Sequence, residues 1–388
     1  MTSRLPATTT GPVPVAPVLS LLFATGWAAN HFVALLPVLR EQEHLSAGLL
    51  AGVFGLYAVG LLPGLLLGGS LSDRIGRRRL ALPGAAVALA GTVSLLAWHD
   101  PAGLVVGRLL VGLGAGATIS AGTAWATDRR GAAGSVRAGV ALTAGFAAGP
   151  VVSGVLAQWL PAPLVVAFAL SAALSVGAIL AAARVDALPP PDGPVPTDPV
   201  PVRPRSAHTA LGWALPVAPF VFTSTAVGIV TLPSRLEGSV GGPLPAGLGA
   251  GLVMGTGVVA QMVARRLHAG ASVGVVGATA SAAGLALVAA VVADPPLGMF
   301  LLAGTLLGVG YGLCLRGGLL DLATWAPPAR RGSLTGVFYV CAYLGFGVPV
   351  LVEALRPAWG DRLPLLVLAG AAAVAAAHRG WRLRRHHH

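Results

Sequence analysis

Long apolar runs dominate this chain and limit what it can fold into. Twelve stretches of roughly 20 residues recur along it, each long enough to cross about 30 Å of hydrocarbon as a helix. Charged residues make up 10% of the 388 residues, whereas soluble domains carry about 25%. The chain has too few polar residues to cover a core in water. We therefore predict an all-α polytopic membrane protein that has the lipid bilayer as its partner.

A proline-rich segment divides the twelve runs into two sets of six. Residues 185–209 contain eight prolines, which exclude a continuous helix and predict an extended cytoplasmic linker. We expect six-helix bundles over residues 16–184 and 210–378, a disordered cytoplasmic tail over 1–15 and a basic cytoplasmic tail over 379–388. The spans are expected near 16–39, 45–69, 80–98, 102–127, 138–160, 163–184, 210–232, 244–264, 271–293, 296–323, 332–355 and 361–378.

The two sets of runs resemble each other in sequence. GLGAGATISAG in the fourth run (112–122) aligns with GVGYGLCLRGG in the tenth (308–318), and a basic loop follows each of them. An internal duplication explains this most simply and predicts two pseudo-symmetric halves. Duplicated halves with a site between them are the plan of many transporters.

The basic residues are all arginine, and most lie in short clusters between apolar runs. If the N-terminus is cytoplasmic, 19 arginines fall on the inner side and four on the outer side. This bias predicts a multi-pass protein of the inner cell membrane with both termini in the cytoplasm. The clusters fit membrane topology better than a nucleic-acid-binding face, so no nucleic-acid partner is expected despite the net charge of +12.

The loop between the second and third runs reads GGSLSDRIGRRRL, from Gly68 to Leu80. It resembles the loop signature of the major facilitator superfamily of secondary transporters, and the likeness in span number, linker and topology covers the whole chain. The resemblance implies a cytoplasmic latch in which Asp73 meets helix ends of the other half and an arginine of its own loop. The alternative is that the arginines of this loop only set the membrane topology, but this interpretation does not explain Asp73. The expected latch residues are Gly69, Asp73, Arg74, Gly76, Arg77, Arg78 and Asp128.

The fifth run contains GFAAGPVVSG, from Gly145 to Gly154. This segment resembles the antiporter signature of the same superfamily at Gly145, Gly149, Pro150 and Gly154, although Ser153 replaces an expected glycine. The resemblance implies a seal against the other half, and a plain packing kink at Pro150 is the alternative.

Several polar residues within the runs are candidates for a substrate or proton pathway. Arg108 lies inside the fourth run, in GRLLVGLGAGA, which resembles a superfamily pattern with an intramembrane arginine; snorkelling to the outer surface is the alternative. His31, at a similar depth in the first run, titrates near neutral pH and could face Arg108, or it could be a neutral packing residue. The candidate pathway residues are Asn30, His31, Arg108, Arg316 and Glu353.

These features predict a secondary active transporter that works by alternating access. We expect a proton antiporter that exports a small amphipathic compound or metabolite, with the proton gradient as energy source and without cofactor or metal. A proton-coupled uptake symporter is the alternative. A membrane-embedded enzyme is a distant third, because paired acids or metal ligands at one membrane face are not visible in the sequence. The protein is expected to be a monomer.

Overall fold

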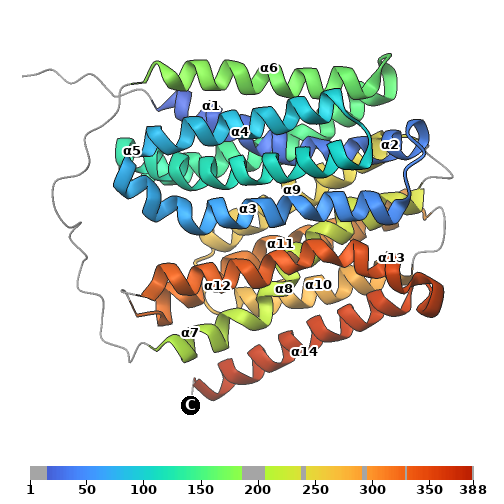
Figure 1. Cartoon of the computed structure of the whole chain (residues 1–388). Coiled ribbons are helices and arrows are strands. Elements are labelled where there is room, and N and C mark those ends of the chain that lie inside the picture. Colours follow the sequence, from blue (N-terminus) through green and yellow to red (C-terminus); the bar gives the residue numbers. More distant parts are fainter. Residues whose placement is uncertain (1–14, 186–205, 237–241, 291–294, 328–329, 387–388) are drawn as a thin grey trace, which may run out of the picture.

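The computed structural model describes residues 15–185, 206–236, 242–290, 295–327 and 330–386. Its helices lie side by side in two groups, α1 to α6 in blue to green and α7 to α14 in yellow to red (Figure 1). Within the described residues there is no strand, and twelve helices are long and apolar enough to cross a membrane. The predicted all-α fold with twelve spans is confirmed. The expected tail over 1–14 and the linker over 186–205 lie outside the described residues.

The first half begins with an interrupted span. Span 1 consists of α1 (Ala16–Asn30), the 3-10 helix η1 (His31–Leu35) and α2 (Leu36–Gln42). The other spans of this half are α3 (Ala47–Ile75), α4 (Arg77–Ala97), the two parts of α5 (Pro101–Trp159) and α6 (Pro163–Ala183). Gly131, with φ of 56°, separates spans 4 and 5 within α5.

The second half also contains six spans, and its first span is again interrupted. Span 7 runs through α7 (Ala207–Ala214), the 3-10 helix η2 (Leu215–Val217), α8 (Ala218–Ala226), the π-helix η3 (Val227–Thr231) and the 3-10 helix η4 (Pro233–Leu236). Spans 8 to 10 are α9 (Leu244–Arg266), α10 (Val273–Ala290) and α11 (Leu297–Trp325). Span 11 consists of α12 (Arg331–Tyr343), the 3-10 helix η6 (Leu344–Gly347) and α13 (Val348–Trp359), and span 12 is α14 (Leu363–His386).

Local sequence signals set several of the helix ends. Ser46 and Asp100 cap α3 and α5 by accepting hydrogen bonds from Leu49 N (3.2 Å) and Gly103 N (2.6 Å). Ser206 caps α7 in the same way. Gly76 ends α3 at a φ of 100°, a conformation that favours glycine, so the chain turns there directly into α4.

Span 12 is longer than the sequence indicated. The expected basic tail over 379–388 is wrong for residues 379–386, because α14 continues to His386. Arg379 lies in this helix and is fully buried, whereas Arg384 and Arg385 are exposed. The arginine cluster belongs to the C-terminal end of this helix rather than to a free tail.

Candidate functional site

Spans 1 and 7, the first span of each half, are both interrupted. In span 1 the α-helix stops at Asn30 and continues as a 3-10 turn. In span 7 a 3-10 turn at Leu215 and a π-helical turn from Val227 break the helix twice. Such breaks free backbone groups, and in transporters interrupted spans at corresponding places of two repeats point to the binding site.

Arg108 of span 4 reaches the break in span 1. Its guanidinium donates to Ala29 O at 2.9 Å and lies 3.5 Å from Phe54 O. It also lies over the rings of Phe32 (4.7 Å) and Tyr57 (4.8 Å). The side chain is 1% exposed, so it is not snorkelling, and Arg108 Nε has no partner among the described residues. Carbonyl dipoles and aromatic faces surround this cation where a carboxylate would be usual.

Asn30 and His31 occupy the same break but point elsewhere. Asn30 donates to Phe146 O of span 5 at 2.8 Å. His31 Nδ1 lies 3.1 Å from the carbonyls of both Trp27 and Ala28, and its ring meets Phe168 of α6 edge-on at 5.3 Å. Within the part of the chain that the structure describes, no hydrogen bond joins His31 to Arg108. His31 and Arg108 both contact carbonyl groups in the last turn of α1. The His31 ring lies toward α6, and the Arg108 guanidinium lies toward α3.

The structure does not bring Arg316 to this centre. Arg316 follows Leu313 by one helical turn, and Leu313 packs with residues of α9 and α10. Tyr311, by contrast, packs against Phe222 of span 7 at 6.2 Å between ring centroids. Arg316 shares the helix face of Leu313, and among the described residues no hydrogen bond or ion pair joins it to Arg108 or to the break in span 1.

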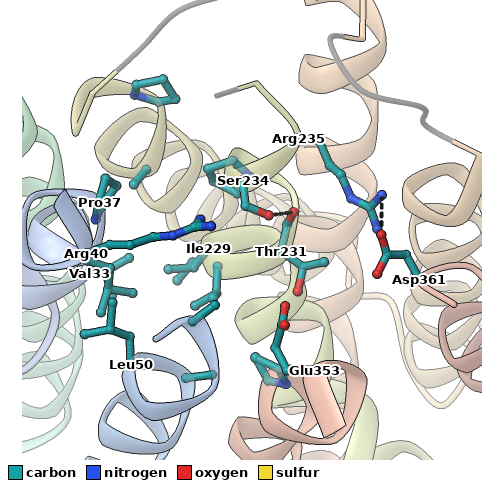
Figure 2. A pocket seen from close by; sticks show the side chains of 18 of the residues that line it. Val33, Pro37, Arg40, Leu50, Ile229, Thr231, Ser234, Arg235, Glu353 and Asp361 are labelled. Carbon is teal, nitrogen blue, oxygen red and sulfur yellow. Dashed lines mark hydrogen bonds and ion pairs between the residues drawn. The ribbon is translucent and has the colours of Figure 1, made fainter. Parts of the chain in front are cut away.

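Glu353 lines a cavity near the expected outer ends of the spans. This cavity has a volume of about 400 Å³ and is lined by both halves, with Val33 and Leu50 on one side and Ile229 on the other (Figure 2). Its charged lining residues are Arg40, Arg235, Glu353, Arg356 and Asp361.

Ion pairs join four of these charges within the second half. Arg356 contacts Glu353 at 3.1 Å and Asp361 at 2.5 Å, and Arg235 lies 3.6 Å from Asp361. Arg40 is the charged lining residue contributed by the first half, and it extends across the cavity in Figure 2. The outer cavity therefore has charged walls and an apolar floor between the halves.

An aromatic cluster lies between span 2 and the second half. Phe222 stacks on Tyr343 at 4.4 Å and on Phe346 at 4.8 Å. Phe346 also contacts Phe54 of span 2 at 5.3 Å, so the stack crosses the boundary between the halves. None of its residues is among the candidate pathway residues that the sequence suggested. The aromatic cluster consists of Phe54, Tyr57, Phe222, Tyr311, Tyr339, Tyr343 and Phe346.

The latch residues gather at the expected inner end of the first half. Arg77 pairs with Asp73 and, at 3.1 Å, with Asp128, and it donates to Ser72 Oγ at 2.7 Å. Arg78 donates to Ala183 O at the end of α6 at 2.6 Å. These contacts all lie within the first half.

The other expected latch residues form no ion pair with the described residues. Gly69 lies near Ser120 of span 4, and Gly76 makes the turn between α3 and α4. Arg74 makes no polar contact with the described residues. The Asp73 side chain is 61% exposed, and the structure shows it paired with Arg77 rather than with helix ends of the other half. The expected contact of Asp73 across the halves is absent from the described residues in this conformation.

We predict that Asp73→Asn folds normally but transports at least tenfold more slowly. Exposed ion pairs contribute about 0–1 kcal/mol to stability, so losing this one should not unfold the protein. Its loss would remove the carboxylate that can meet the other half when the inner side closes. Thermal unfolding and transport by the purified variant in proteoliposomes measure the two effects. Wild-type turnover would mean that the loop only sets topology.

The antiporter-type segment of span 5 has two different faces. A Cβ at Gly149 would lie 3.0 Å from Trp27 O and 3.4 Å from His31 Cβ, and Gly145 meets the backbone of Phe23. Both glycines thus pack on span 1 of their own half, and the expectation that they seal against the other half is wrong for them. Pro150 and Gly154 do contact the other half, where they meet Gly247 of span 8.

A buried ion pair at the expected inner end of the second half was not predicted from the sequence. Asp321 of α11 is 4% exposed and accepts a hydrogen bond of 2.7 Å from Arg379, which is 0% exposed. Arg379 also donates to Trp213 O, and Arg382 donates to Gly212 O at 2.5 Å while covering the Trp213 ring at 4.0 Å. A lone Asp within the tenth apolar run was the signal that could have revealed this site.

A charged cavity between two halves that each begin with an interrupted span is typical of polytopic transport proteins. The family model of the Major Facilitator Superfamily matches residues 18–348. The chain belongs to the Major Facilitator Superfamily, a family of transporters.

Relatives of known name are similar over short segments. The 3-(3-hydroxy-phenyl)propionate transporter of Escherichia coli (strain K12) is 46% identical over 70 residues, which are 17% of either chain. The multidrug resistance protein MdtL of Escherichia coli (strain UTI89 / UPEC) is 33% identical over 98 residues, 25% of either chain. The matched segments thus span between a sixth and a quarter of these relatives.

Solved structures are similar over nearly the whole chain. A POT peptide transporter in complex with sulfate superposes with a TM-score of 0.79 at 14% identity, covering 98% of this chain and 96% of that one. The POT family transporter PepTSo gives a TM-score of 0.73 at 14% identity, with 96% and 97% covered. At this level of identity the likeness establishes the fold alone.

Proposed function

We propose that this protein is a proton-driven exporter of small amphipathic compounds that works by alternating access. The observation that carries the proposal is the contact between spans 5 and 8. Gly247 and Gly251 of span 8 meet Pro150 and Val151 of span 5, but Gly255, one turn further along the same face, has no atom within 4 Å of its added Cβ. Spans 5 and 8 therefore touch near one end and part toward the other, as a facing pair of spans does when two halves rock.

The names of the relatives support a small organic substrate. One relative is named for the transport of an aromatic acid and another for multidrug resistance. The antiporter-type segment in span 5 favours export, which is also the direction that the multidrug name suggests. Uptake by proton symport remains the second candidate, because the outer cavity opens between the halves where an external substrate would enter.

Gradient-driven transport tests the proposed function. Purified protein in proteoliposomes should accumulate compounds from an amphipathic panel when a pH gradient is imposed and should stop when the gradient is collapsed. The sign of the gradient that drives accumulation separates antiport from symport. Absence of gradient-driven transport of every compound would refute the proposal.

The proton site can be assigned with His31→Gln and Glu353→Gln. His31 is fully buried with Nε2 unpartnered in the described structure, whereas Glu353 faces the outer cavity beside Arg356. We expect Glu353→Gln to lower gradient-driven accumulation more than tenfold while substrate exchange without a gradient persists, because the cavity gives that carboxylate access to protons. His31→Gln tests the other candidate proton site in the same two assays. If both variants accumulate substrate as the wild type does, coupling through these residues is wrong.

We also propose that the protein is a monomer in the inner cell membrane with both termini and the 185–209 linker in the cytoplasm, as the arginine bias indicates. A cysteine at Ser206, the cap residue of α7, should then react with an impermeant reagent in inverted vesicles and stay unlabelled in intact cells. Labelling of intact cells as fast as of inverted vesicles would reverse the topology.

A further inference from the structure

The four tyrosines of this chain lie deep within its spans. Tyr57, Tyr311, Tyr339 and Tyr343 are its complete set, and all belong to the aromatic cluster. Tyr57 lies ten residues after the start of α3, and Tyr343 lies twelve residues after the start of α12. At the rise of an α-helix these positions are about 15 and 18 Å from the first residue of the helix. Tyrosines of membrane helices normally gather at the two interfaces. Their concentration at mid-depth calls for a reason other than anchoring.

Stacked rings form a flat-sided wall at this place. The rings of Phe222 and Tyr343 are 23° from parallel, those of Phe222 and Phe346 27°, and those of Tyr343 and Phe346 17°. Offset stacking of this kind suits a further planar ring. Tyr57 connects the wall to Arg108, whose guanidinium lies over its ring.

Two hydrogen-bond donors beside the wall have no partner. Tyr57 Oη and Arg108 Nε are both buried and unpartnered in the described structure. Among the described side chains, no carboxylate contacts Arg108 or the aromatic cluster. A buried donor without an acceptor is costly, and a buried cation without a counter-charge more so. This place offers donors and positive charge, so it suits an anion and repels a cation.

The outer cavity lies next to this place, and its lining residues are neighbours of the cluster rather than members of it. Its lining includes Leu50, one turn before Phe54 on α3, and Val33, which is next to Phe32 beneath Arg108. Ile229, on the opposite side, follows Phe222 by two turns of span 7. A molecule resting on the cavity floor is therefore about one helical turn from the cluster.

We infer that the aromatic cluster and Arg108 form a subsite for planar aromatic carboxylates. The ring of such a compound stacks on Phe222, Tyr343 and Phe346, and its carboxylate accepts hydrogen bonds from Tyr57 Oη and Arg108. The inference rests on the proposed function, because it names the substrate class of that transporter. It excludes aromatic cations as the preferred cargo.

Equilibrium binding to the purified full-length protein tests the subsite. The probes are naphthalene-2-carboxylate, its neutral amide, the cation 2-naphthylmethylamine and the saturated decahydronaphthalene-2-carboxylate. We expect naphthalene-2-carboxylate to bind about tenfold more tightly than the amide or the saturated acid, and the cation to bind most weakly. Equal affinity for the aromatic and saturated acids, preference for the cation, or no binding of naphthalene-2-carboxylate would overturn the inference.

Variants assign the selectivity to the cluster. Tyr343→Leu should weaken naphthalene-2-carboxylate about fivefold and leave the saturated acid unchanged. Tyr57→Phe, which keeps the ring, should weaken both acids and leave the amine unchanged. Phe23→Leu, an aromatic residue of α1 outside the cluster, is the control and should bind as the wild type does. Unchanged binding in both cluster variants would place the site elsewhere.

The binding and transport assays fail independently. Gradient-driven transport of panel compounds without binding of naphthalene-2-carboxylate refutes the subsite and leaves the transporter standing. Selective binding without gradient-driven transport of any compound refutes the proposed function and leaves the subsite standing.

Discussion

Gly154→Leu is expected to lower turnover more than tenfold while the protein still folds. A Cβ at this position would lie 3.1 Å from Pro243 O and 3.2 Å from Gly247 Cα, both in the other half. A leucine therefore prevents spans 5 and 8 from meeting, as close helix contacts require small residues. Within the first half the added Cβ makes only an ordinary contact of 3.6 Å with Ala34 Cβ, so folding should survive. Transport in proteoliposomes and thermal unfolding of the same preparation measure both effects.

Two other glycines provide comparison variants for this substitution, one as a control and one as a second test. Gly177 of span 6 has open space around its added Cβ and is exposed, so Gly177→Leu should transport normally. Gly255 is also open in this conformation, but it lies on the span 8 face that would approach span 5 if the other end closed. Gly255→Leu should therefore impair transport while favouring the conformation described here. Normal turnover of Gly154→Leu would show that transport does not depend on the close contact between spans 5 and 8.

Arg379→Gln is expected to destabilise the protein by about 3–5 kcal/mol, because it leaves the Asp321 carboxylate buried without a cation. Asp321 lies 2.7 Å from Arg379, and both side chains are withdrawn from solvent. The double variant Asp321→Asn with Arg379→Gln should regain most of that stability. Unfolding of the purified variants by denaturant or heat measures the difference.

The exposed Arg384 of the same helix is the matched control for this pair. Arg384→Gln should leave the unfolding transition where it is in the wild type. A double variant as unstable as Arg379→Gln alone would show that the arginine acts through Trp213 O and packing rather than through Asp321.

Hydropathy along the sequence predicted the number and positions of the spans. All twelve expected runs became spans, and apart from the C-terminal end of span 12 their ends lie within about six residues of the expected ones, because the length of an apolar run is set by the bilayer. The end of span 12 escaped this reasoning, since Arg379 is buried by a carboxylate from a run 58 residues away. Pairing between distant spans leaves no periodic trace in either segment.

The site was harder to predict because side-chain direction within an apolar helix is not encoded by hydropathy. Gly149 and Gly154 belong to one motif, yet they face span 1 and span 8, respectively. Arg316 and Tyr311 share α11, but only Tyr311 joins the aromatic cluster. Motif and polarity marked Gly149, Gly154 and Arg316 as unusual, but the tertiary packing decided which residues they meet.

The central claim is that the two halves alternate, and the distance between the inner parts of spans 5 and 8 tests it most directly. Spin labels at Gly139, which has open surroundings, and at the exposed Val259 would report that distance after Cys314 and Cys341 are replaced by serine. We predict two distance populations in lipid whose ratio changes with pH and with a transported substrate. A single distance that responds to neither would contradict alternating access in this protein.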